Sequence, residues 1–339
     1  MLRDYQQTCI EAVLNYVKYK QSHCIVQAPT GSGKSHLIRN LSEILMQNGN
    51  VLILAHRKEL LEQNQAKFKK QEYTGIISAG LGTKDYTKPI TIAGVQTLAN
   101  SYQEFDNKHI KYILVDECHR LSNKQDGQYW DIINHFENAI VIGFTATPYR
   151  TDEGALEWGE ICYQITAKSL MDKGYLCPLT NKVSADPDLS NAKIVAGEYK
   201  TSDVSAVMCE DDLIGLSVEK LKHYSANRNS VLIFCTDINH VNKLHFAMAT
   251  ERMRAEKVTG ATPKKERAQI LQDFKDGKIK YLLNCEVLTT GFDAPNIDMI
   301  LVVRPTMSKS LHVQILGRSC RNYLSISEAY KKYLDLRQK

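Results

Sequence analysis

Short runs of apolar residues alternate along most of the chain with longer stretches of helical spacing. In the first half the apolar runs lie at 24–27, 51–55, 113–115 and 140–144, and the stretch 59–69 between two of them has helical spacing. The runs lack strict alternation with polar residues, which is typical of strands buried on both faces of a parallel sheet. The pattern therefore predicts strand–helix units that build a mostly parallel sheet covered by helices.

A polar stretch from about 180 to 212 interrupts this alternation. It is rich in Asp, Asn, Ser and Lys, and we interpret it as a connection with a short hairpin of its own. Strand-like and helix-like runs then return at 231–235, 239–249, 281–283 and 298–303. The predicted organisation is an α/β domain over 1–175, a connecting region over 176–212, a second α/β domain over 213–323 and a C-terminal tail over 324–339.

Composition sets broad limits. With 339 residues, 43% of them hydrophobic, the chain is long enough and apolar enough for two globular domains. The net charge of +5 permits a polyanionic partner without requiring one. Nine scattered cysteines, with no C-x-x-C pair, favour free thiols in a reducing cytoplasm over disulfides or zinc. No apolar run approaches the ~20 residues that span a bilayer, and the chain opens on polar residues, so we expect a soluble, cytoplasmic protein.

A glycine-rich segment follows the first apolar run and precedes a helix-like stretch over 36–47. It reads Ala28-Pro29-Thr30-Gly31-Ser32-Gly33-Lys34-Ser35. Its two glycines allow a tight turn whose N–H groups point at an anion, and the helix N-terminus adds partial positive charge there. Lys34 is placed to reach the β- and γ-phosphates of a nucleotide, and Ser35 offers a hydroxyl to Mg²⁺. The segment predicts a phosphate-binding loop, with all residues after Ala28 as candidate contacts.

Two adjacent carboxylates follow the strand-like run at 112–115, in the order Asp116-Glu117-Cys118-His119. Carboxylates at the end of a buried strand are costly unless they bind a cation or transfer protons. With a phosphate loop earlier in the chain, Asp116 is assigned to Mg²⁺. Glu117 is assigned to the water that attacks the γ-phosphate.

These segments and several shorter ones resemble, in order, the motifs of superfamily two helicases and translocases. The branch is the one that includes type III restriction enzyme motor subunits and related phage and repair helicases. The resemblance runs from about residue 2 to residue 321. Besides the two segments above, the matching first-domain segments are Leu2-Arg3-Asp4-Tyr5-Gln6, Ala55-His56-Arg57, Gly94-Val95-Gln96-Thr97 and Thr145-Ala146-Thr147-Pro148.

The resemblance implies a role for each of these segments. The implied roles are adenine contact for Gln6 and Arg3, grip on the nucleic-acid backbone for His56, Arg57, Gln96 and Thr97, and coupling of hydrolysis to nucleic acid for His119, Thr145 and Thr147. Each role is an expectation from the resemblance.

Three segments of the second domain continue the resemblance. They are the strand-like 231–235, the segment Leu288-Thr289-Thr290-Gly291-Phe292-Asp293-Ala294-Pro295 and the segment Gln314-Ile315-Leu316-Gly317-Arg318-Ser319-Cys320-Arg321. The implied contacts are a backbone phosphate for Thr289 and Thr290, and the ribose or the coupling network for Asp293. Gln314, Arg318 and Arg321 are the implied catalytic groups, with Arg321 as the arginine finger.

The resemblance implies two RecA-like domains, each a mostly parallel sheet flanked by helices. One domain would hold ATP and Mg²⁺, and the other would bring arginine charge to the γ-phosphate when the two close. The implied activity is that of an ATP-dependent DNA helicase or translocase in replication, recombination or repair. Two alternatives stay open: an RNA-stimulated ATPase, since no motif here reports 2′-hydroxyl contacts, and a nucleotide-gated nucleic-acid-binding loader. We see no substrate-selecting module in the sequence, so a protein partner that supplies specificity is a further expectation.

Overall fold

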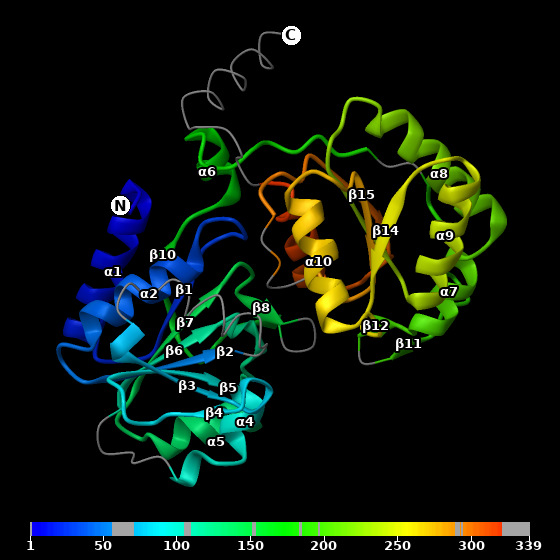
Figure 1. Ribbon diagram of the computed structural model, residues 1–339. Coiled ribbons are helices and arrows are strands. Elements are labelled where there is room, and N and C mark those ends of the chain that lie inside the picture. Colours follow the sequence, from blue (N-terminus) through cyan, green and yellow to red (C-terminus); the bar gives the residue numbers. More distant parts are fainter. Residues whose placement is uncertain are drawn as a thin grey trace. The chain divides into compact units, whose positions relative to one another are not determined.

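The computed structural model describes residues 2–55, 71–104, 110–150, 154–182, 185–195, 197–288, 292 and 294–320 (Figure 1). The chain divides into two compact units, Met1–Leu170 and Met171–Lys339, here called unit 1 and unit 2. Within the described ranges, no helix is both long and apolar enough to cross a bilayer. The predicted helix over 59–69 and the tail over 324–339 lie outside these ranges.

Unit 1 is built on an eight-stranded sheet of order β10-β1-β7-β6-β2-β5-β3-β4, in which only the β3–β4 pair is antiparallel. Its strands are β1 Cys24–Gln27, β2 Asn50–Ala55, β3 Thr74–Ser78, β4 Thr83–Lys84, β5 Ile90–Gly94, β6 Ile110–Asp116, β7 Ile140–Thr145 and β10 Glu160–Gln164. A separate small hairpin pairs β8 Tyr149–Arg150 with β9 Gly154–Ala155. The four apolar runs of the first half all lie on central strands and are almost fully buried, which confirms the prediction of a mostly parallel sheet.

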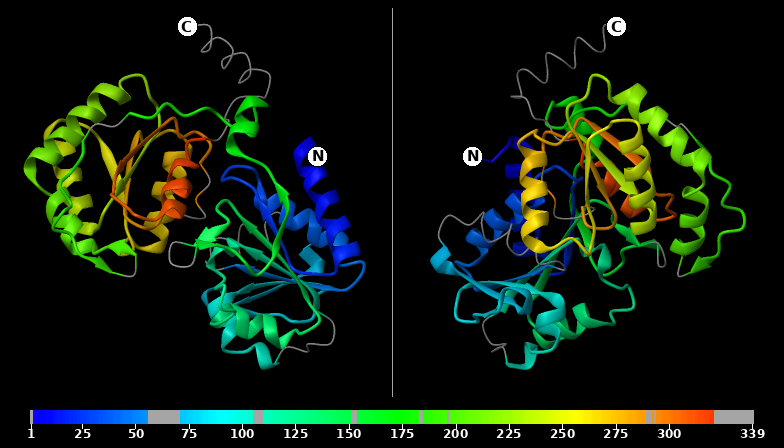
Figure 2. Two further views of the ribbon diagram at one scale, coloured as in Figure 1. Left: turned by 180° about the vertical axis from the view of Figure 1, so that it is seen from behind. Right: turned by 45° about the vertical axis from the view of Figure 1, so that its right-hand side comes forward.

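Helices cover both faces of this sheet (Figures 1 and 2). They are α1 Asp4–Lys20, α2 Lys34–Leu45, α4 Val95–Ala99 and α5 Gln128–His135, with short 3₁₀ turns η1 Gln71–Tyr73, η2 Ala79–Leu81, η3 Tyr102–Glu104 and η5 Cys118–Arg120. α4 and α5 bury Leu98, Trp130 and Ile133 against one face of the sheet. α1 and α2 pack together on the other face, where Val13 and Leu41 are almost fully buried. α6 Ala167–Asp172 crosses the division between the units.

Unit 2 is built on a four-stranded parallel sheet of order β14-β15-β13-β16. Its strands are β13 Val231–Cys235, β14 Ala255–Val258, β15 Tyr281–Asn284 and β16 Met299–Val303, and a separate hairpin pairs β11 Ile194–Val195 with β12 Glu198–Tyr199. Its helices are α7 Thr201–Met208, α8 Asp211–Ser225, α9 Ile238–Thr250, α10 Lys264–Lys275 and α11 Lys309–Leu316. The strand-like runs predicted in the second half fall on β13, β15 and β16, so the α/β prediction is confirmed for this half as well.

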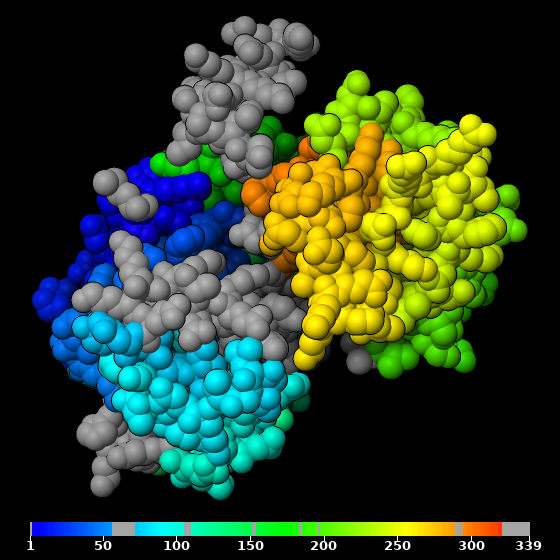
Figure 3. All heavy atoms as spheres, in the orientation of Figure 1, coloured from blue at the N-terminus to red at the C-terminus, as the bar shows by residue number. Residues whose placement is uncertain are grey.

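The sheet of unit 2 lies between two layers of helices (Figure 1). On one face, α7, α8 and α9 contribute Met208, Leu221 and Leu244 to the core. On the other face, α10 and α11 contribute Phe274 and Ile315. The outer side of α10 is exposed, and its yellow and orange atoms form part of the near surface in Figure 3. The predicted connecting region 176–212 contains the β11–β12 hairpin, α7 and the start of α8, and it lies in unit 2.

Candidate nucleotide-binding site

The glycine-rich loop joins the end of β1 to the start of α2. Gly31 and Gly33 have φ values of 86° and 83°, in the left-handed region that favours glycine. A Cβ atom on Gly33 would also lie 2.7 Å from Nε2 of Gln6. Gly33 precedes α2 as its N-cap and provides no side-chain cap for the first N–H groups of this 12-residue helix. The loop therefore presents backbone donors and the positive end of a helix dipole at one point, as an anion requires.

Two residues at the start of α1, Tyr5 and Gln6, hold this loop through hydrogen bonds. The Tyr5 hydroxyl and the Gln6 amide both donate to the carbonyl of Ser32, at 2.7 and 3.1 Å. The Gln6 Oε1 accepts from the backbone N–H of Arg3 at 3.0 Å, so both ends of the amide are bonded. Burial raises the pKa of Tyr5, which keeps its hydroxyl a donor. Sequence reasoning singled out Arg3 and Gln6 but missed Tyr5, whose only signal was its place between them.

Lys34 lies at the start of α2, and 9% of its surface is exposed. Its ammonium group donates to the carbonyl of Ala28 at 3.3 Å and lies 3.9 Å from Oε1 of Glu117. Two buried hydroxyl oxygens of the same loop, Thr30 Oγ1 and Ser32 Oγ, have no hydrogen-bond partner. A buried cation with few contacts beside unsatisfied hydroxyls fits the phosphates of a nucleotide.

Asp116 ends β6 and is 3% exposed, and Glu117 follows it in the left-handed conformation with φ 53°. This conformation is uncommon for a residue with a side chain and marks local strain. Asp116 Oδ1 accepts from the N–H of Glu117 at 3.0 Å. The strained turn directs the Glu117 carboxylate toward Lys34, and its buried Oε2 has no hydrogen-bond partner. A carboxyl oxygen without a hydrogen-bond donor is placed to accept from a water molecule.

A Mg²⁺ ion would need oxygen ligands at this end of β6. Among the residues that the structure describes, no three His, Cys, Asp or Glu side chains are grouped to hold a metal ion by themselves. Mg²⁺ keeps several waters and binds through one or two protein oxygens plus phosphate. Ser35 on α2 and Asp116 at the end of β6 are the residues expected to supply these oxygens.

His119 joins this carboxylate to the end of β7. Its Nδ1 lies 3.0 Å from Thr145 Oγ1 and 3.5 Å from Glu117 Oε2. The Thr145 hydroxyl donates to the carbonyl of Thr147 and accepts from the N–H of the same residue, both at 3.0 Å. Because the only hydrogen of the Thr145 hydroxyl is donated to Thr147, this hydroxyl can only accept from His119. Nδ1 of His119 is therefore assigned the proton and donates to Thr145. Burial lowers the pKa of His119 more than the Glu117 carboxylate raises it, so the ring is neutral at neutral pH.

Strand register explains why segments so far apart in sequence meet here. In the parallel pairing of β1 with β7, Gln27 lies opposite Thr145, and in that of β6 with β7, Asp116 lies opposite Phe144. The N–H of Ala28 also donates to the carbonyl of Thr145 at 2.9 Å. The three strands therefore end side by side, and the residues after each carboxyl end gather at one edge of the sheet.

The β8–β9 hairpin, which follows Thr145 to Pro148, is fixed to the turn after the carboxylates. Arg150 Nη1 donates to the carbonyl of Arg120 at 2.9 Å. The Asn123 amide donates to the carbonyl of Ala155 at 2.7 Å and accepts from the N–H of Glu157 at 2.9 Å. Sequence reasoning assigned this role to neither Arg150 nor Asn123, because each bonds to a backbone carbonyl 30 or 32 residues away in sequence.

The expected nucleic-acid contacts of unit 1 are only partly described. Gln96 and Thr97 lie on α4, directly after β5, where Gln96 is exposed and Thr97 Oγ1 accepts from the N–H of Ala79 at 3.2 Å. His56 and Arg57 lie outside the described residues. Their roles remain predictions from the resemblance.

In unit 2 the described candidates are Gln314 and Arg318, which are 7% and 6% exposed. Arg318 Nη1 donates to the carbonyl of Phe292 at 2.7 Å, so this arginine joins the end of α11 to the segment after β15. Four expected site residues of this unit lie outside the described ranges, namely Thr289, Thr290, Asp293 and Arg321.

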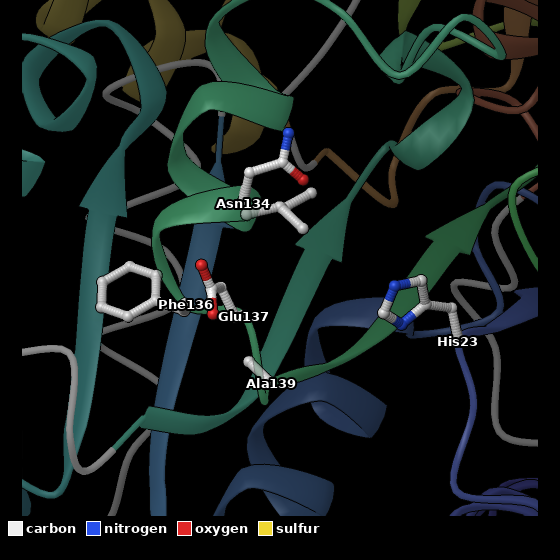
Figure 4. Close-up of a pocket in the computed structure, with 6 residues that line it drawn as sticks. His23, Asn134, Phe136, Glu137 and Ala139 are labelled. Atoms are coloured by element: carbon white, nitrogen blue, oxygen red, sulfur yellow. The ribbon is translucent and has the colours of Figure 1, made fainter.

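A hollow of about 360 Å³ lies elsewhere in unit 1 (Figure 4). It is lined by His23, Asn134, Glu137 and their neighbours, with His23 just before β1 and Ala139 just before β7. Because the phosphate loop follows the carboxyl end of β1, this hollow lies at the opposite end of the strands. No residue expected to bind nucleotide lines it.

Comparison with known families agrees with this geometry. Residues 1–150 match the family described as type III restriction enzyme, res subunit, and residues 216–323 match the helicase conserved C-terminal domain. The chain belongs to helicase superfamily two. The two matches fall on unit 1 and unit 2 respectively, which confirms the resemblance inferred from the motifs.

Individual members of this superfamily resemble the chain over nearly its whole length. "Putative ATP-dependent helicase IRC3" of Saccharomyces cerevisiae is 33% identical over 343 residues, which cover 95% of this chain and 49% of that protein. "DNA 3'-5' translocase XPB2" of Sulfurisphaera tokodaii is 25% identical over 365 residues, which cover 94% of this chain and 78% of that protein.

A solved structure shows the same fold. It is a fragment of "a putative HsdR subunit of a type I restriction enzyme" from Vibrio vulnificus YJ016, with a TM-score of 0.72 at 22% identity, covering 97% of this chain and 62% of that one. The likeness supports the RecA-like assignment of both units. The chain spans about half the length of the curated Irc3 relatives it matches, 49% and 55%.

Proposed function

We propose that the chain hydrolyses ATP and uses the cycle to move on, or to remodel, DNA. The observation that carries the proposal is the continuous contact from Lys34 through Glu117 and His119 to Thr145. This chain of contacts joins the phosphate loop, the carboxylate pair and the segment before the β8–β9 hairpin. A rearrangement at the phosphate end would therefore alter the position of a surface element, which is what a motor needs.

Each group in unit 1 has a separate part in this proposal. Lys34 and the first N–H groups of α2 would hold the phosphates, and Ser35 and Asp116 would ligate Mg²⁺. The bound ion would neutralise phosphate charge. Glu117 would orient and deprotonate water through its unsatisfied Oε2. Arg321 of unit 2 would stabilise the charge that develops on the γ-phosphate, as the resemblance implies.

DNA is favoured as the track because the XPB2 relative, which the chain covers to 78% of its length, is named a DNA translocase. A role in replication, recombination or repair is part of the same proposal. The deciding experiment is steady-state ATP hydrolysis by the purified protein alone, with single-stranded DNA, with duplex DNA and with RNA of matched length. Strong stimulation by DNA is expected, together with a steep loss of affinity as salt rises, since the contacts are to phosphates. Equal rates with and without any polymer would refute the motor.

An accessory protein that binds nucleic acid and loads another machine is the second candidate. It predicts tight ATP-dependent binding with negligible turnover. Glu117 argues against it, because a clamp has no need of a strained carboxylate aimed at the phosphate site. A protein partner that selects the substrate is compatible with either candidate. Capture of such a partner from the native host, followed by a strand-displacement assay with and without the partner, would test it.

A further inference from the structure

A tyrosine on the edge strand β10 is hydrogen-bonded to the segment that supports the phosphate loop. The Tyr163 hydroxyl donates to the backbone carbonyl of Tyr5 at 3.0 Å, and the Tyr5 hydroxyl donates to the carbonyl of Ser32 at 2.7 Å. Two tyrosines in series therefore join β10 to the phosphate loop. Neither hydroxyl belongs to the groups assigned above to phosphate, Mg²⁺ or water.

Both hydroxyls keep their hydrogens at neutral pH. Burial raises the pKa of Tyr163 to about 12, and burial also raises the pKa of Tyr5. A neutral phenol has one hydrogen to donate, and a backbone carbonyl only accepts. The direction of both bonds is therefore fixed, from β10 toward the loop.

An extra residue in β10 turns Tyr163 toward α1. β10 pairs with β1 in parallel, with Ile161 opposite Ile25. Val26, the next residue of β1, lies opposite Tyr163, so Cys162 is an extra residue in β10. Consecutive strand residues point to opposite faces of the sheet, so Ile161 and Tyr163 also point to opposite faces, whereas in a regular strand they would share one. The Ile161 side chain is accordingly 47% exposed, while Tyr163 reaches α1.

The end of β10 is also bonded to the end of β1. Gln164 lies opposite Gln27, and the N–H of Ile165 donates to the Gln27 carbonyl at 3.0 Å. The phosphate loop begins at the next residue, Ala28. In the eight-stranded sheet β10 lies at the edge and pairs on one side, with β1. A displacement of the end of β10 therefore reaches the loop by two routes, the backbone of β1 and the hydroxyl of Tyr163.

β10 leads directly into the connection between the two units. Two residues separate it from α6, the helix that contains the division between the units (Figures 1 and 2). The N–H groups of Ser169 and Leu170 donate to the hydroxyl and the carbonyl of Thr166, at 3.1 and 3.2 Å. These bonds cap the start of α6, and Leu170 is fully buried. Because β10 and α6 follow one another without a long linker, a displacement of α6 acts on Tyr163.

We propose that Tyr163 is a positioning residue that transmits displacement of this connection to the phosphate loop, and so makes the affinity for ATP depend on bound DNA. The proposal rests on the proposed function, because it requires that bound DNA displaces the connection between the units. DNA would favour one placement of α6 and β10, and the two hydrogen bonds would favour the matching placement of the Ser32 carbonyl. By linkage, ATP would then strengthen DNA binding by the same factor.

A purely structural role for Tyr163 makes a different prediction. α1 is joined to β10 at a second point, where the Tyr16 hydroxyl donates to the Glu160 carboxylate at 2.9 Å. Glu160 is the first residue of β10, and Tyr16 lies roughly three helical turns after Tyr5. This second bond also joins α1 to β10 through a tyrosine hydroxyl, but it does not lead to Ser32. Tyr16→Phe is therefore a matched control for Tyr163→Phe.

The test measures binding of a fluorescent ATP analogue to the full chain, with and without a saturating single-stranded DNA oligonucleotide. The ratio of the two dissociation constants is the coupling factor. Tyr163→Phe should reduce this factor about fivefold, the change expected from the loss of one hydrogen bond. Tyr16→Phe should keep the factor of the unaltered protein. Thermal melting of both variants establishes that they are folded.

The reciprocal measurement uses the affinity for DNA. The gain in DNA affinity on addition of the ATP analogue should fall by the same factor in Tyr163→Phe as the coupling factor does. A loss in one direction without the other would show that the variant acts on binding at one site alone, and would overturn the proposal.

A double variant tests whether the two tyrosines act in series. Tyr5→Phe breaks the last bond between Tyr163 and the loop, so the addition of Tyr163→Phe should lower the coupling factor no further. Such non-additivity is typical of groups in one hydrogen-bond network. Full additivity in the double variant would show that Tyr163 acts by another route, and would refute the series of bonds.

The remaining outcomes separate the role of Tyr163 from the motor. Stimulation of ATP turnover by DNA, with a coupling factor of one in the unaltered protein or an unchanged factor in Tyr163→Phe, would refute this role alone. Equal weakening of ATP binding with and without DNA would make Tyr163 a support of the loop only, and would also overturn the proposal. No stimulation of the unaltered protein by DNA would refute the proposed function and the role of Tyr163 with it.

Discussion

Each unit has its own mostly parallel sheet between helical layers, but the two units differ in how their buried polar groups are hydrogen-bonded. In unit 1, buried oxygens at the carboxyl edge have no hydrogen-bond partner, among them Thr30 Oγ1, Ser32 Oγ and Glu117 Oε2. In unit 2, the described arginine of the last motif, Arg318, donates to the unit's own backbone at Phe292. Buried polar groups without partners are costly in a folded chain, so the gathering of these three around the phosphate loop indicates a site that a ligand completes. Arg318 instead joins two segments of unit 2 to each other.

The strongest test of this comparison is the loss of the cation in unit 1. Lys34→Ala should reduce ATP turnover to background, a fall of about 10³-fold or more, because no other buried ammonium group of the described chain lies in this loop. Steady-state hydrolysis with saturating DNA measures the change. Lys264→Ala, at the exposed start of α10, is the matched control and should leave turnover unaltered. Substantial ATP turnover by Lys34→Ala would show that the nucleotide phosphates do not bind at this loop.

Replacement of Arg321 should affect ATP turnover, whereas replacement of Arg318 should affect the stability of unit 2. Arg321→Ala should lower ATP turnover by about 10³-fold with an unchanged melting temperature, as expected for an arginine finger. Arg318→Ala removes a buried hydrogen bond of 2.7 Å and should lower the free energy of unfolding by about 1–3 kcal/mol. Hydrolysis and thermal melting are measured on both variants. Normal turnover in Arg321→Ala would show that another group stabilises the phosphate.

Replacement of the carboxylate should stop hydrolysis and spare binding. Glu117→Gln keeps the shape of the side chain but removes the base, so turnover should fall by about 10²- to 10³-fold. The dissociation constant of a fluorescent ATP analogue should change little, and the ATP-bound protein should remain on nucleic acid. Weak nucleotide binding by this variant would assign Glu117 to the binding of phosphate instead of to water.

Acid should weaken unit 2 through His240. Burial lowers the pKa of this histidine to about 4, whereas an unfolded histidine titrates near 6.5. The unfolded chain therefore takes up a proton first, and stability should fall as pH decreases from about 6.5 to about 4, by no more than about 3 kcal/mol. His240→Gln should remove this dependence.

The positions of the tryptophans allow the two units to be followed separately. The chain has two tryptophans, Trp130 and Trp158, and both lie in unit 1. Urea unfolding of the full chain followed by tryptophan fluorescence therefore reports unit 1, while circular dichroism reports both units. The effect of His240→Gln should appear only in the circular dichroism. An equal shift in both signals would mean that the units unfold as one.

The smallest effect is expected at the support of the phosphate loop. Tyr5→Phe removes one hydrogen bond to the Ser32 carbonyl, worth about 1 kcal/mol, so the KM for ATP should rise about fivefold at constant kcat. Tyr16→Phe, which loses a hydroxyl on the exposed side of the same helix, is the control. An unchanged KM would show that Gln6 alone positions the loop.

Sequence reasoning predicted the strands with the strongest local apolar signal, such as β6 and β13, and missed β3, β5, β10 and β14. Ile113 to Val115 and Val231 to Cys235 are fully or almost fully buried, and an apolar run of this length has few other uses in a chain of this kind. The phosphate loop could be predicted from the sequence equally well, since its glycine spacing reflects backbone angles that only glycine adopts readily.

The remaining features of the site depend on pairs of residues distant in sequence. Tyr5 acts on a carbonyl 27 residues away, and Arg150 on one 30 residues away, so neither could be inferred from spacing. The resemblance to superfamily two implied a catalytic role for Arg318, but no sequence signal pointed to its hydrogen bond with the Phe292 carbonyl. ATP turnover by Arg318→Ala tests the catalytic role. The hydrogen bond from Tyr163 to the Tyr5 carbonyl joins residues 158 apart and had no sequence signal.

The attachment of Tyr5 and Gln6 to the Ser32 carbonyl has a practical consequence for anyone who handles this protein. The segment that contains Tyr5 and Gln6 supports the glycine-rich loop and cannot be removed without loss of these two hydrogen bonds. A purification tag fused directly before Leu2 would lie next to this support. Material truncated within this stretch could bind nucleotide poorly while its remaining sequence showed every motif intact.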